Sequence, residues 1–403
     1  MAKRLSIPSK QVELEIVGAH DSFLASRVQR VNTTADQAVN TIDELGNPLH
    51  AGTSKDVPNV TLTFQAMDAG IKVVGALAGV STSGWVAGSG VNVATSLDRS
   101  VDAIVRIRDE NVAQYVKAAH LRRCIIQSFT YNYTVDGDST EEYTAVGSTK
   151  RWFTNDVIVD RIIGDGSATY TISEAFQQLK NGENAISVLV EGVYHEEVSG
   201  APTEDGTYQL TGTTLTFNTG DEPAATEVIM VVYQSQASGD AWTDISDDTL
   251  PAAIRGKDVV VAIAAADQER VQSLSVNVNF NSQPIREMGS RQIIGYLNQV
   301  PEVTGSITVL DTDTDLLALL SGSATTDSEF PMGQCAASGV ALEVKLQNPA
   351  DCAEPFAVLK TVFLSSVSMT SEGFTANVND NAQQTIDWRS DDGSLVVYNG
   401  AKP

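Results

Sequence analysis

The sequence predicts a mainly-β protein with two tandem antiparallel β-sandwich or barrel domains, short flanking helices and a small β-sandwich inserted between the two domains. Three observations support this fold class. The chain has 403 residues, which is about two to three times the usual length of one domain. Aromatic residues make up only 6% of it and glycines number 30, a balance that favours a turn-rich β-protein over a helical enzyme. In addition, two segments of the chain repeat one another.

The repeat is a gapless self-match at an offset of 243 positions. It aligns residues 27–79 with residues 270–322, and 14 of the 53 aligned pairs are identical. Amino-acid frequencies typical of globular chains would give about three or four identities at an arbitrary offset. The match therefore indicates a duplicated structural unit, which has to be recognised before any fold is assigned.

Both aligned segments carry the same succession of local patterns. Residues 60–64 and 274–280 alternate apolar and polar side chains, as half-buried strands do. Long loops rich in Gly, Asn, Gln and charge occupy residues 34–56 and 281–299. Each is followed by Val-Pro, where proline suits the first residue of a strand. Each copy is thus predicted to contain a strand, a long loop and a second strand.

A short helix is expected after the second strand of each copy. Asp68 and Asp311 stand where a helix N-cap belongs, and Gly79 and Gly322 stand where a C′ glycine belongs. The acidic run that begins at Asp311 has the D-x-D-x-D spacing of a calcium loop. A leucine occupies the position of the loop glycine, however, so a helix start is favoured over a calcium site.

The correspondence between the copies extends beyond the matched block. Upstream, residues 12–16 resemble residues 259–263 in kind. Downstream, residues 121–128 resemble residues 359–366, and both strands are expected to run on to turn glycines, at Gly137 and Gly373.

These boundaries divide the chain into four parts. Copy 1 is predicted to span residues 1–153 and copy 2 residues 256–403. Between them lie an inserted module, residues 156–239, and a linker, residues 240–255. The inserted module has alternating runs of its own, separated by Gly, Asp and Pro turns, at residues 186–190, 214–217 and 227–233. A small independent β-sandwich is the expected structure.

Charge and composition limit the possible partners. With 26 basic and 51 acidic residues the formal net charge is −25, so tight binding of nucleic-acid phosphates is not expected. No apolar run approaches the roughly 18 residues of a membrane-spanning helix. The N-terminus lacks the apolar segment of a secretory signal, so synthesis in a cytoplasm is expected. Cys124, Cys335 and Cys352 lack C-x-x-C spacing and are expected to be free structural thiols.

The second copy resembles a known family. Its strand at residues 272–276, the loop around Gly295, the V-P-x-V-T-G strand at residues 300–309 and the short helix after it resemble a phage major tail tube protein. The resemblance covers most of both copies. It implies two packed antiparallel sheets with a flanking helix, in which one sheet of each domain joins its neighbours to line a hollow cylinder.

The resemblance also implies an assembly. Six tube domains usually form a ring in such tails, so three copies of a two-domain chain would form a homotrimeric, pseudo-hexameric ring, and the rings would stack into a tube. An acidic lumen would then let double-stranded DNA pass during genome ejection without specific binding, and the alternative is that the acidity serves solubility or a saline habitat. The implied partners are further copies of the chain and the tail-tip or baseplate, tape-measure and tail terminator proteins. The implied location is the virion tail, assembled in the host cytoplasm, with no membrane insertion.

Candidate contact residues come from the same resemblance, because the long loop of such proteins reaches the adjacent ring. The candidate ring-to-ring stacking positions are Glu44, Gly46, Gly52, Glu287, Gly289 and Gly295. A basic cluster of Lys117, Arg122 and Arg123 lies on and before a predicted strand. It is a candidate subunit-interface cluster that pairs with acids of a neighbour, and a solvated face is the alternative.

The inserted module is too large for a lumen of DNA width and is expected to project outward as an immunoglobulin-like decoration. This favours a non-contractile, siphovirus-type tail over one that a sheath surrounds. The module is either a passive spacer or a weak binder of host surface glycans.

Chemical motifs for catalysis are absent from the sequence, so no enzyme, cofactor or metal site is expected. The four histidines are isolated, and the glycine-serine loops match no nucleophile, phosphate or dinucleotide fingerprint. Two alternatives to a tail tube subunit remain open. One is a carbohydrate-binding or adhesion β-sandwich protein, and the other is a baseplate hub or injection-system tube protein that shares the fold without polymerising.

Overall fold

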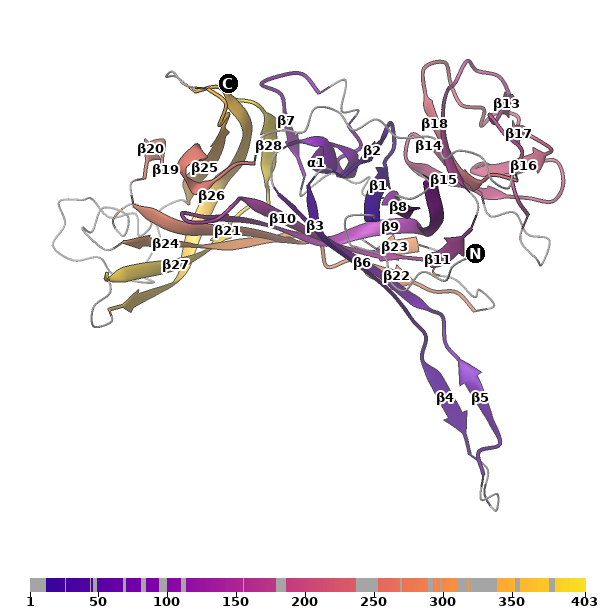
Figure 1. The fold of residues 1–403 in the computed structure, drawn as a ribbon, viewed down its shortest axis with the longest axis horizontal. Helices are drawn as coiled ribbons and strands as arrows, with labels where there is room; N and C mark the ends of the chain where they lie inside the picture. The colour runs from indigo at the N-terminus through magenta and orange to yellow at the C-terminus, as the bar shows by residue number, and fades with distance from the viewer. Residues whose placement is uncertain are drawn as a thin grey trace.

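A computed structural model describes most of the chain. It covers residues 12–25, 27–43, 45, 49–67, 70–80, 85–93, 100–109, 114–154, 156–178, 186–236, 253–268, 270–288, 293, 295–297, 299–310, 318, 339–351, 356–376 and 381–403. Strands account for 62% and helices for 3%, so the predicted mainly-β class is confirmed (Figure 1).

Strands of both copies join in one sheet of 17 strands. The strands of copy 1 are β1 (Val12–Val17), β2 (Ser22–Leu24), β3 (Val28–Asp36), β4 (Val39–Ile42), β5 (Gly52–Lys55), β6 (Asn59–Met67), β7 (Gly90–Asn92), β8 (Ser100–Asp109), β9 (Gln114–Thr134), β10 (Thr140–Gly147) and β11 (Thr149–Phe153), with helix α1 (Lys72–Leu77) after β6. The strands of copy 2 are β19 (Val259–Ile263), β20 (Ala266–Asp267), β21 (Val271–Asn279), β22 (Gln283–Ile285), β23 (Gly295–Leu297), β24 (Glu302–Leu310), β25 (Val340–Gln347), β26 (Val358–Thr375), β27 (Gln383–Ser390) and β28 (Val396–Asn399), preceded by the 3-10 turn η2 (Gly256–Asp258). Among the described strands of the two copies, β4–β5 and β22–β23 stand apart from this sheet, as two-stranded hairpins.

The repeat recurs in the strands themselves. β3 and β21, and likewise β6 and β24, have the same bounds after a shift of 243 residues. The shift also holds for the β-bulges: Gln29 and Gln272 are the extra residues in one pair of strands, and Gln127 and Thr370 in another. Because a bulge fixes the register of a strand pair, the two copies share their backbone hydrogen-bond pattern.

The identical Arg-Val-Gln triplet at the start of β3 and β21 has a local structural cause. Arg27 and Arg270 both adopt positive φ, 52° and 62°. The next bulge glutamine in each copy donates its side-chain amide back to the arginine carbonyl, at 3.1 Å from Gln29 and 3.2 Å from Gln272. This bond stabilises the strained turn that starts the strand.

Two details of the sequence alignment are wrong. The ladders place Leu121 at the position of Leu364, not Leu359, because β9 and β26 keep the offset of 243. Gly373 is not a turn residue but lies inside β26, opposite Thr385. The upstream correspondence of residues 12–16 with 259–263 is confirmed, since β1 pairs with β8 as β19 pairs with β25.

Helix α1 begins later than predicted. Its N-cap is Ile71, which makes no side-chain capping bond, and Asp68 lies outside the described residues. The predicted C′ glycine is confirmed: Gly79 has φ 65° and donates to Ala76, while Val80 donates to Gly75, as in a Schellman motif. Of the corresponding segment in copy 2 the structure describes only Ala318, which is helical.

The inserted module forms a separate sheet of seven strands, in which the predicted strands at residues 186–190, 214–217 and 227–233 are present. Its strands are β12 (Val157–Ile163), β13 (Thr169–Thr171), β14 (Ser187–Val190), β15 (Val193–Glu197), β16 (Thr207–Thr211), β17 (Thr214–Phe217) and β18 (Val228–Gln234). The first and last strands, β12 and β18, pair along their whole length. The chain therefore enters and leaves the module at the same end.

One equivalent cross-strand pair is filled differently in the two copies. In copy 1 the pair is Leu62 and Ala145, and in copy 2 it is Gly305 and Trp388. Leu62, Ala145 and Trp388 are all buried. The glycine makes room for the indole, because a Cβ at Gly305 would overlap the Trp388 ring and the Ser275 carbonyl oxygen. The register is kept while side-chain volume moves from one strand to the other.

We expect Gly305→Ala to destabilise the protein by about 3 kcal/mol, since overpacking a rigid core forces strain on its surroundings. The cost should shrink when Trp388→Ala is present as well, which a double-mutant cycle of thermal or urea unfolding measures. Gly52→Ala is the matched control, because nothing lies within 4 Å of a Cβ there. An equal cost of Gly305→Ala in both backgrounds would contradict the volume exchange.

Candidate subunit interface

Eight strands of the large sheet form one continuous antiparallel band, four from each copy. Their order is β3, β6, β10, β9, β21, β24, β27 and β26. In Figure 1 this band arches, with α1, β28 and the inserted module above it and the hairpin β4–β5 extending below. Among the described strands, β3 has no partner beyond β6, and the final residues of β26 have none beyond β27. The band therefore ends in two open edges.

The two copies join in the middle of the band, where β9 pairs with β21. Seven residues of each strand are paired, from Ser128 opposite Asn279 to Thr134 opposite Ser273. Thr130 adds a side-chain hydrogen bond of 2.9 Å to Asn277. We call this junction the seam, and it shows how one copy binds the next.

A lysine lies buried at the seam. Lys360 of copy 2 is 1% exposed, and its ammonium lies 4.1 Å from the ring centre of Tyr131 and 3.8 Å from a carboxylate oxygen of Glu141, both in copy 1. A buried ammonium needs such partners, because removal from water is costly. The pair of a cation with an aromatic face and a carboxylate therefore links the copies through side chains as well as backbone.

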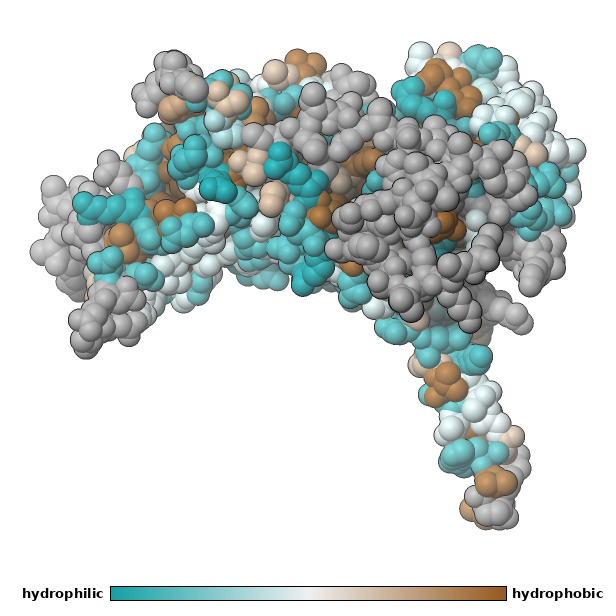
Figure 2. Space-filling model, viewed as in Figure 1, coloured by the Kyte–Doolittle hydropathy of each residue, from teal (hydrophilic) through white to brown (hydrophobic). Residues whose placement is uncertain are grey.

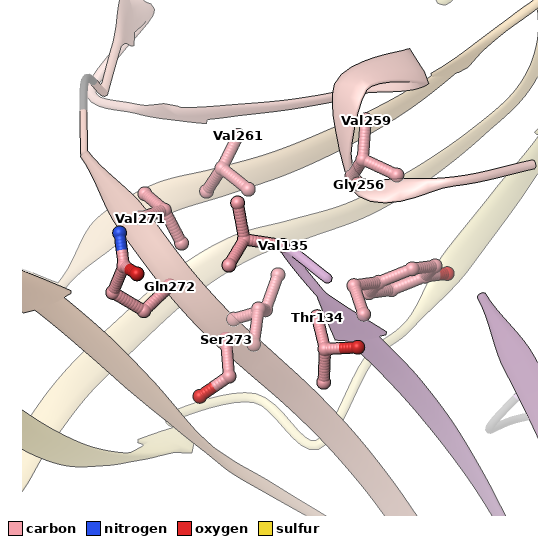
Figure 3. A pocket seen from close by; sticks show the side chains of 10 residues that line it. Thr134, Val135, Gly256, Val259, Val261, Val271, Gln272 and Ser273 are labelled. Atoms are coloured by element: carbon pink, nitrogen blue, oxygen red, sulfur yellow. The ribbon is translucent and has the colours of Figure 1, made fainter. Parts of the chain in front are cut away.

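A small pocket lies at one end of the seam, where the end of β9 meets β19 and β21 (Figure 3). Valines of both copies line it, Val135 from copy 1 with Val261 and Val271 from copy 2. Its lining contains no carboxylate, amine, imidazole or thiol. The pocket is thus a feature of the packing between copies, and its polar side chains are the hydroxyls of Tyr133, Thr134 and Ser273 and the amide of Gln272.

The hairpin β4–β5, here called the arm, contains the long loop of copy 1. Figure 2 shows it projecting from the body with apolar residues on its surface. Val39 and Ile42 are about half exposed, at 52% and 48%. An isolated two-stranded hairpin is marginally stable in water, so an arm of this kind gains stability when another surface packs against it.

The corresponding hairpin of copy 2, β22–β23, lies against the rest of the chain. Tyr296 is half-buried with its hydroxyl oxygen shielded from solvent, and this burial, followed by the neighbouring Cys124 of copy 1, raises the pKa of the hydroxyl. Arg286 forms an ion pair of 3.7 Å with Asp56 at the base of the arm. The two long loops are therefore not equivalent in the single chain.

The candidate stacking positions divide accordingly. Gly52 lies in β5 of the arm, Gly295 lies in β23 opposite Ile285, and Glu287 is exposed just after β22. Glu44, Gly46 and Gly289 lie outside the described residues. The role of all six positions in stacking stays a prediction.

The basic cluster does not act as one group. Arg123 stacks on Tyr194 of the inserted module at 5.0 Å and forms an ion pair of 3.5 Å with Glu196. Arg122 is half-buried. Lys117 does not share this contact with the module, and its ammonium lies 5.1 Å from the centre of the Trp152 ring in copy 1. Arg123 thus contacts the inserted module within the chain, and a subunit-interface role stays a prediction for the cluster.

A buried carboxylate anchors the inserted module to copy 1. Asp102 accepts hydrogen bonds from His120 at 2.8 Å, from the Arg123 amide at 2.9 Å and from the Tyr194 hydroxyl. Burial disfavours the charged form of Asp102, but His120 and these hydrogen bonds outweigh burial and lower the pKa of the carboxyl below its ordinary 3.8. The network therefore favours an ionised Asp102 at neutral pH.

The module and copy 1 also share an apolar core. Val17, Ile104, Ala118 and Phe153 of copy 1 pack with residues of β12, β14 and β18. Beside this core, buried Arg106 binds Glu15 at 2.6 Å. The module is thus packed onto copy 1, in addition to having a core of its own.

Sequence reasoning missed the residues that form the seam. Lys360, Tyr131 and Glu141 were not singled out, although Lys117 and Lys360 are 243 positions apart and identical. That identity, found by extending the offset beyond residue 322, is the signal that identifies the lysine position.

Comparison with known proteins adds no family to this description. No protein-family model matches the chain, and no curated protein matches its sequence. Within the described ranges, the structure contains no helix of the length and apolarity that crossing a bilayer requires. The same residues contain no group of three or more His, Cys, Asp or Glu side chains arranged to hold a metal ion.

We expect Tyr194→Phe to raise the pH at which acid unfolds the protein. Because the folded-state pKa of Asp102 lies below 3.8, its charge stabilises the fold above that pH, and this contribution is lost as the pH falls through the folded-state value. Loss of the hydroxyl donor brings that value back toward 3.8 and costs roughly 1–3 kcal/mol at neutral pH. Circular dichroism across an acid titration measures both effects.

The control is Tyr208→Phe, which removes a buried hydroxyl that has no hydrogen-bond partner within the described part of the chain. Its acid-unfolding midpoint should stay at the wild-type value. Equal midpoints for Tyr194→Phe and the wild type would show that the hydroxyl does not support the Asp102 charge.

Proposed function

We propose that the protein is a self-assembling structural subunit, the major tube protein of a phage tail, and that it forms stacked rings of three chains. The observation that carries this proposal is the eight-stranded band. One copy binds the next through β9 and β21 within the chain, and the band ends in edges that belong to the strands equivalent to these two. Open edges of this kind are satisfied by pairing with another strand.

Repetition of the in-chain step supports a ring. Each step from one copy to the next applies the same rotation, so repeated steps either close or generate a helix. The resemblance to tail tube proteins supplies the number of six domains, and therefore three chains. Eight strands per chain would then give a barrel wall of about 24 strands, which is wide enough for an aqueous channel.

The open face of the band supports conduction of DNA. Its side chains are mostly hydroxyls and amides, such as Thr63, Ser128, Thr130, Asn277 and Ser306. The acids on this face are Asp36, Glu142, Glu302 and Asp387, and the bases are Arg30 and Arg389. We propose that DNA slides along this wall because few cations are available to bind phosphate, with a smaller contribution from negative charge than the composition alone predicts.

The inserted module lies above the band, on the side opposite the open face in Figure 1. In a ring whose lumen is lined by the open face, the module would project outward. This arrangement supports a decorated, non-contractile tail.

Negative-stain electron microscopy of the purified chain tests the proposal. We expect hollow rings with three peripheral knobs, which stack into tubes as the protein concentration rises. Rings that never stack would favour a baseplate hub or injection-system tube protein. Monodisperse monomers at high concentration would contradict the proposal and favour a carbohydrate-binding protein.

The arm supplies a separate prediction about stacking. We expect that deletion of residues 40–51 leaves rings that no longer form tubes, because the arm extends away from the band and exposes apolar residues. The paired substitution Val39→Ser and Ile42→Ser, which keeps the arm length, should weaken stacking in the same direction. Tubes of normal length from the deletion variant would refute the role of the arm.

A further inference from the structure

The in-chain seam specifies which residues would meet between chains. At the seam, residues 128–134 of β9 pair with residues 273–279 of β21. Shifted by 243, these segments become residues 371–377, which start in the last part of β26, and residues 30–36 of β3. The described residues of both segments, 371–376 and 30–36, form the open edges of the band. The edge strands β3 and β26 are thus the equivalents of β21 and β9, which already pair within the chain.

We infer that β3 of one chain pairs antiparallel with the end of β26 of a second copy, in the register of the seam, and that Lys117 of the first chain packs against Phe374 of the second. This inference rests on the proposed function, because it names the contacts that close the ring. The register places Asn32 opposite Thr375, as Ser275 lies opposite Asn132 within the chain.

The exposure of one aromatic residue supports this contact. Tyr131, at the seam, is 0% exposed, whereas its equivalent Phe374 is 58% exposed. The difference arises because copy 2 covers Tyr131 and nothing in the described chain covers Phe374 to the same extent. A second copy docked as at the seam would bury this ring.

The lysine that covers the aromatic ring is present in both copies. Lys360 lies 243 residues after Lys117 and is its equivalent in copy 2. Each side chain lies over an aromatic ring, Lys360 over Tyr131 and Lys117 over Trp152. Lys117 is only half-buried in the single chain. Docking in the seam register brings its ammonium to Phe374 of the second copy.

A carboxylate is also available there. Glu141, the acidic partner of Lys360, is replaced by Gln384 in copy 2. The acid stands instead at Glu372, which occupies the position of Phe129 and accepts a hydrogen bond of 3.1 Å from the Gln384 amide. The second interface would therefore keep a cation, an aromatic face and a carboxylate. The carboxylate would come from the edge strand β26 and not from β27, the equivalent of β10.

The β3 edge carries a protective lysine in the single chain. Lys150 donates to the carbonyl and hydroxyl oxygens of Thr33, at 3.0 and 2.7 Å. Lys150 lies on β11, so this edge is covered by a charged side chain from a neighbouring strand, and covering an edge is a common device against unspecific pairing.

Disulfide cross-linking tests the register. In the full chain, Asn32→Cys combined with Thr375→Cys should give covalent dimers and closed trimers on non-reducing gels, because paired antiparallel residues have the Cα spacing that a disulfide needs. Each single variant controls for the native cysteines. Asn32→Cys with Ser371→Cys is the matched control, since four residues along the strand add about 13 Å.

The outcomes separate this inference from the proposed function. Rings in the micrographs without a covalent product from Asn32→Cys and Thr375→Cys would overturn the register and leave the ring intact. Absence of both rings and covalent product would overturn both.

A second variant tests the side-chain contact without a disulfide. Phe374→Ala should raise the protein concentration at which half the chains are in rings by about tenfold, since a central aromatic residue carries much of an interface's affinity. Val193→Ala, at an equally exposed apolar position of the inserted module, should leave that concentration unchanged. An unchanged value for Phe374→Ala would contradict the contact with Lys117.

Discussion

The backbone pairing of β9 with β21 is the interaction on which the rest of the structure depends. β9 is a strand of 21 residues that pairs with β8, β10 and β11 of its own copy and with β21 of the other. It therefore belongs to the core of copy 1 and to the seam at once. A one-residue shift of its register would turn its core side chains toward solvent, because side chains alternate between faces.

The two copies have the same strand register but differ in their side chains. The bulges at Gln29 and Gln272 fix the start of each repeat, and those at Gln127 and Thr370 fix its long strand. Between these fixed points, Gly305 with Trp388 replaces Leu62 with Ala145. Hydrogen-bond register thus constrains this duplication more tightly than side-chain volume, which neighbouring positions share.

Local patterns allowed much of the fold to be predicted from the sequence. Alternation identified the strands at residues 60–64 and 274–280, and the glycine at position 79 marked the end of a helix, because these signals depend on near neighbours. The alignment of residues 121–128 failed by five positions. Two β-branched, apolar strands look alike at several offsets, and only their ladder partners fix which offset is right.

The seam lay beyond sequence reasoning for a similar reason. Its partners are far apart in the chain, as Thr130 and Asn277 are, and edge-to-edge pairing leaves no periodic trace. The burial of Lys360 could not be predicted either, because a lysine on an amphipathic strand is ordinarily exposed. The net charge of −25 does not specify which face of the sheet carries the acids, and the open face of the band is mainly neutral.

The apolar contact between the inserted module and copy 1 has a consequence for how such a chain diversifies. Val17, Ile104, Ala118 and Phe153 are buried in a cluster that they share with apolar residues of the module, so a chain without the module would expose part of this apolar surface to water. Cutting and rejoining the chain at the two ends of the module is therefore not sufficient to remove or replace it. A replacement needs a matching apolar footprint on copy 1, which ties the evolution of the decoration to that of the domain that carries it.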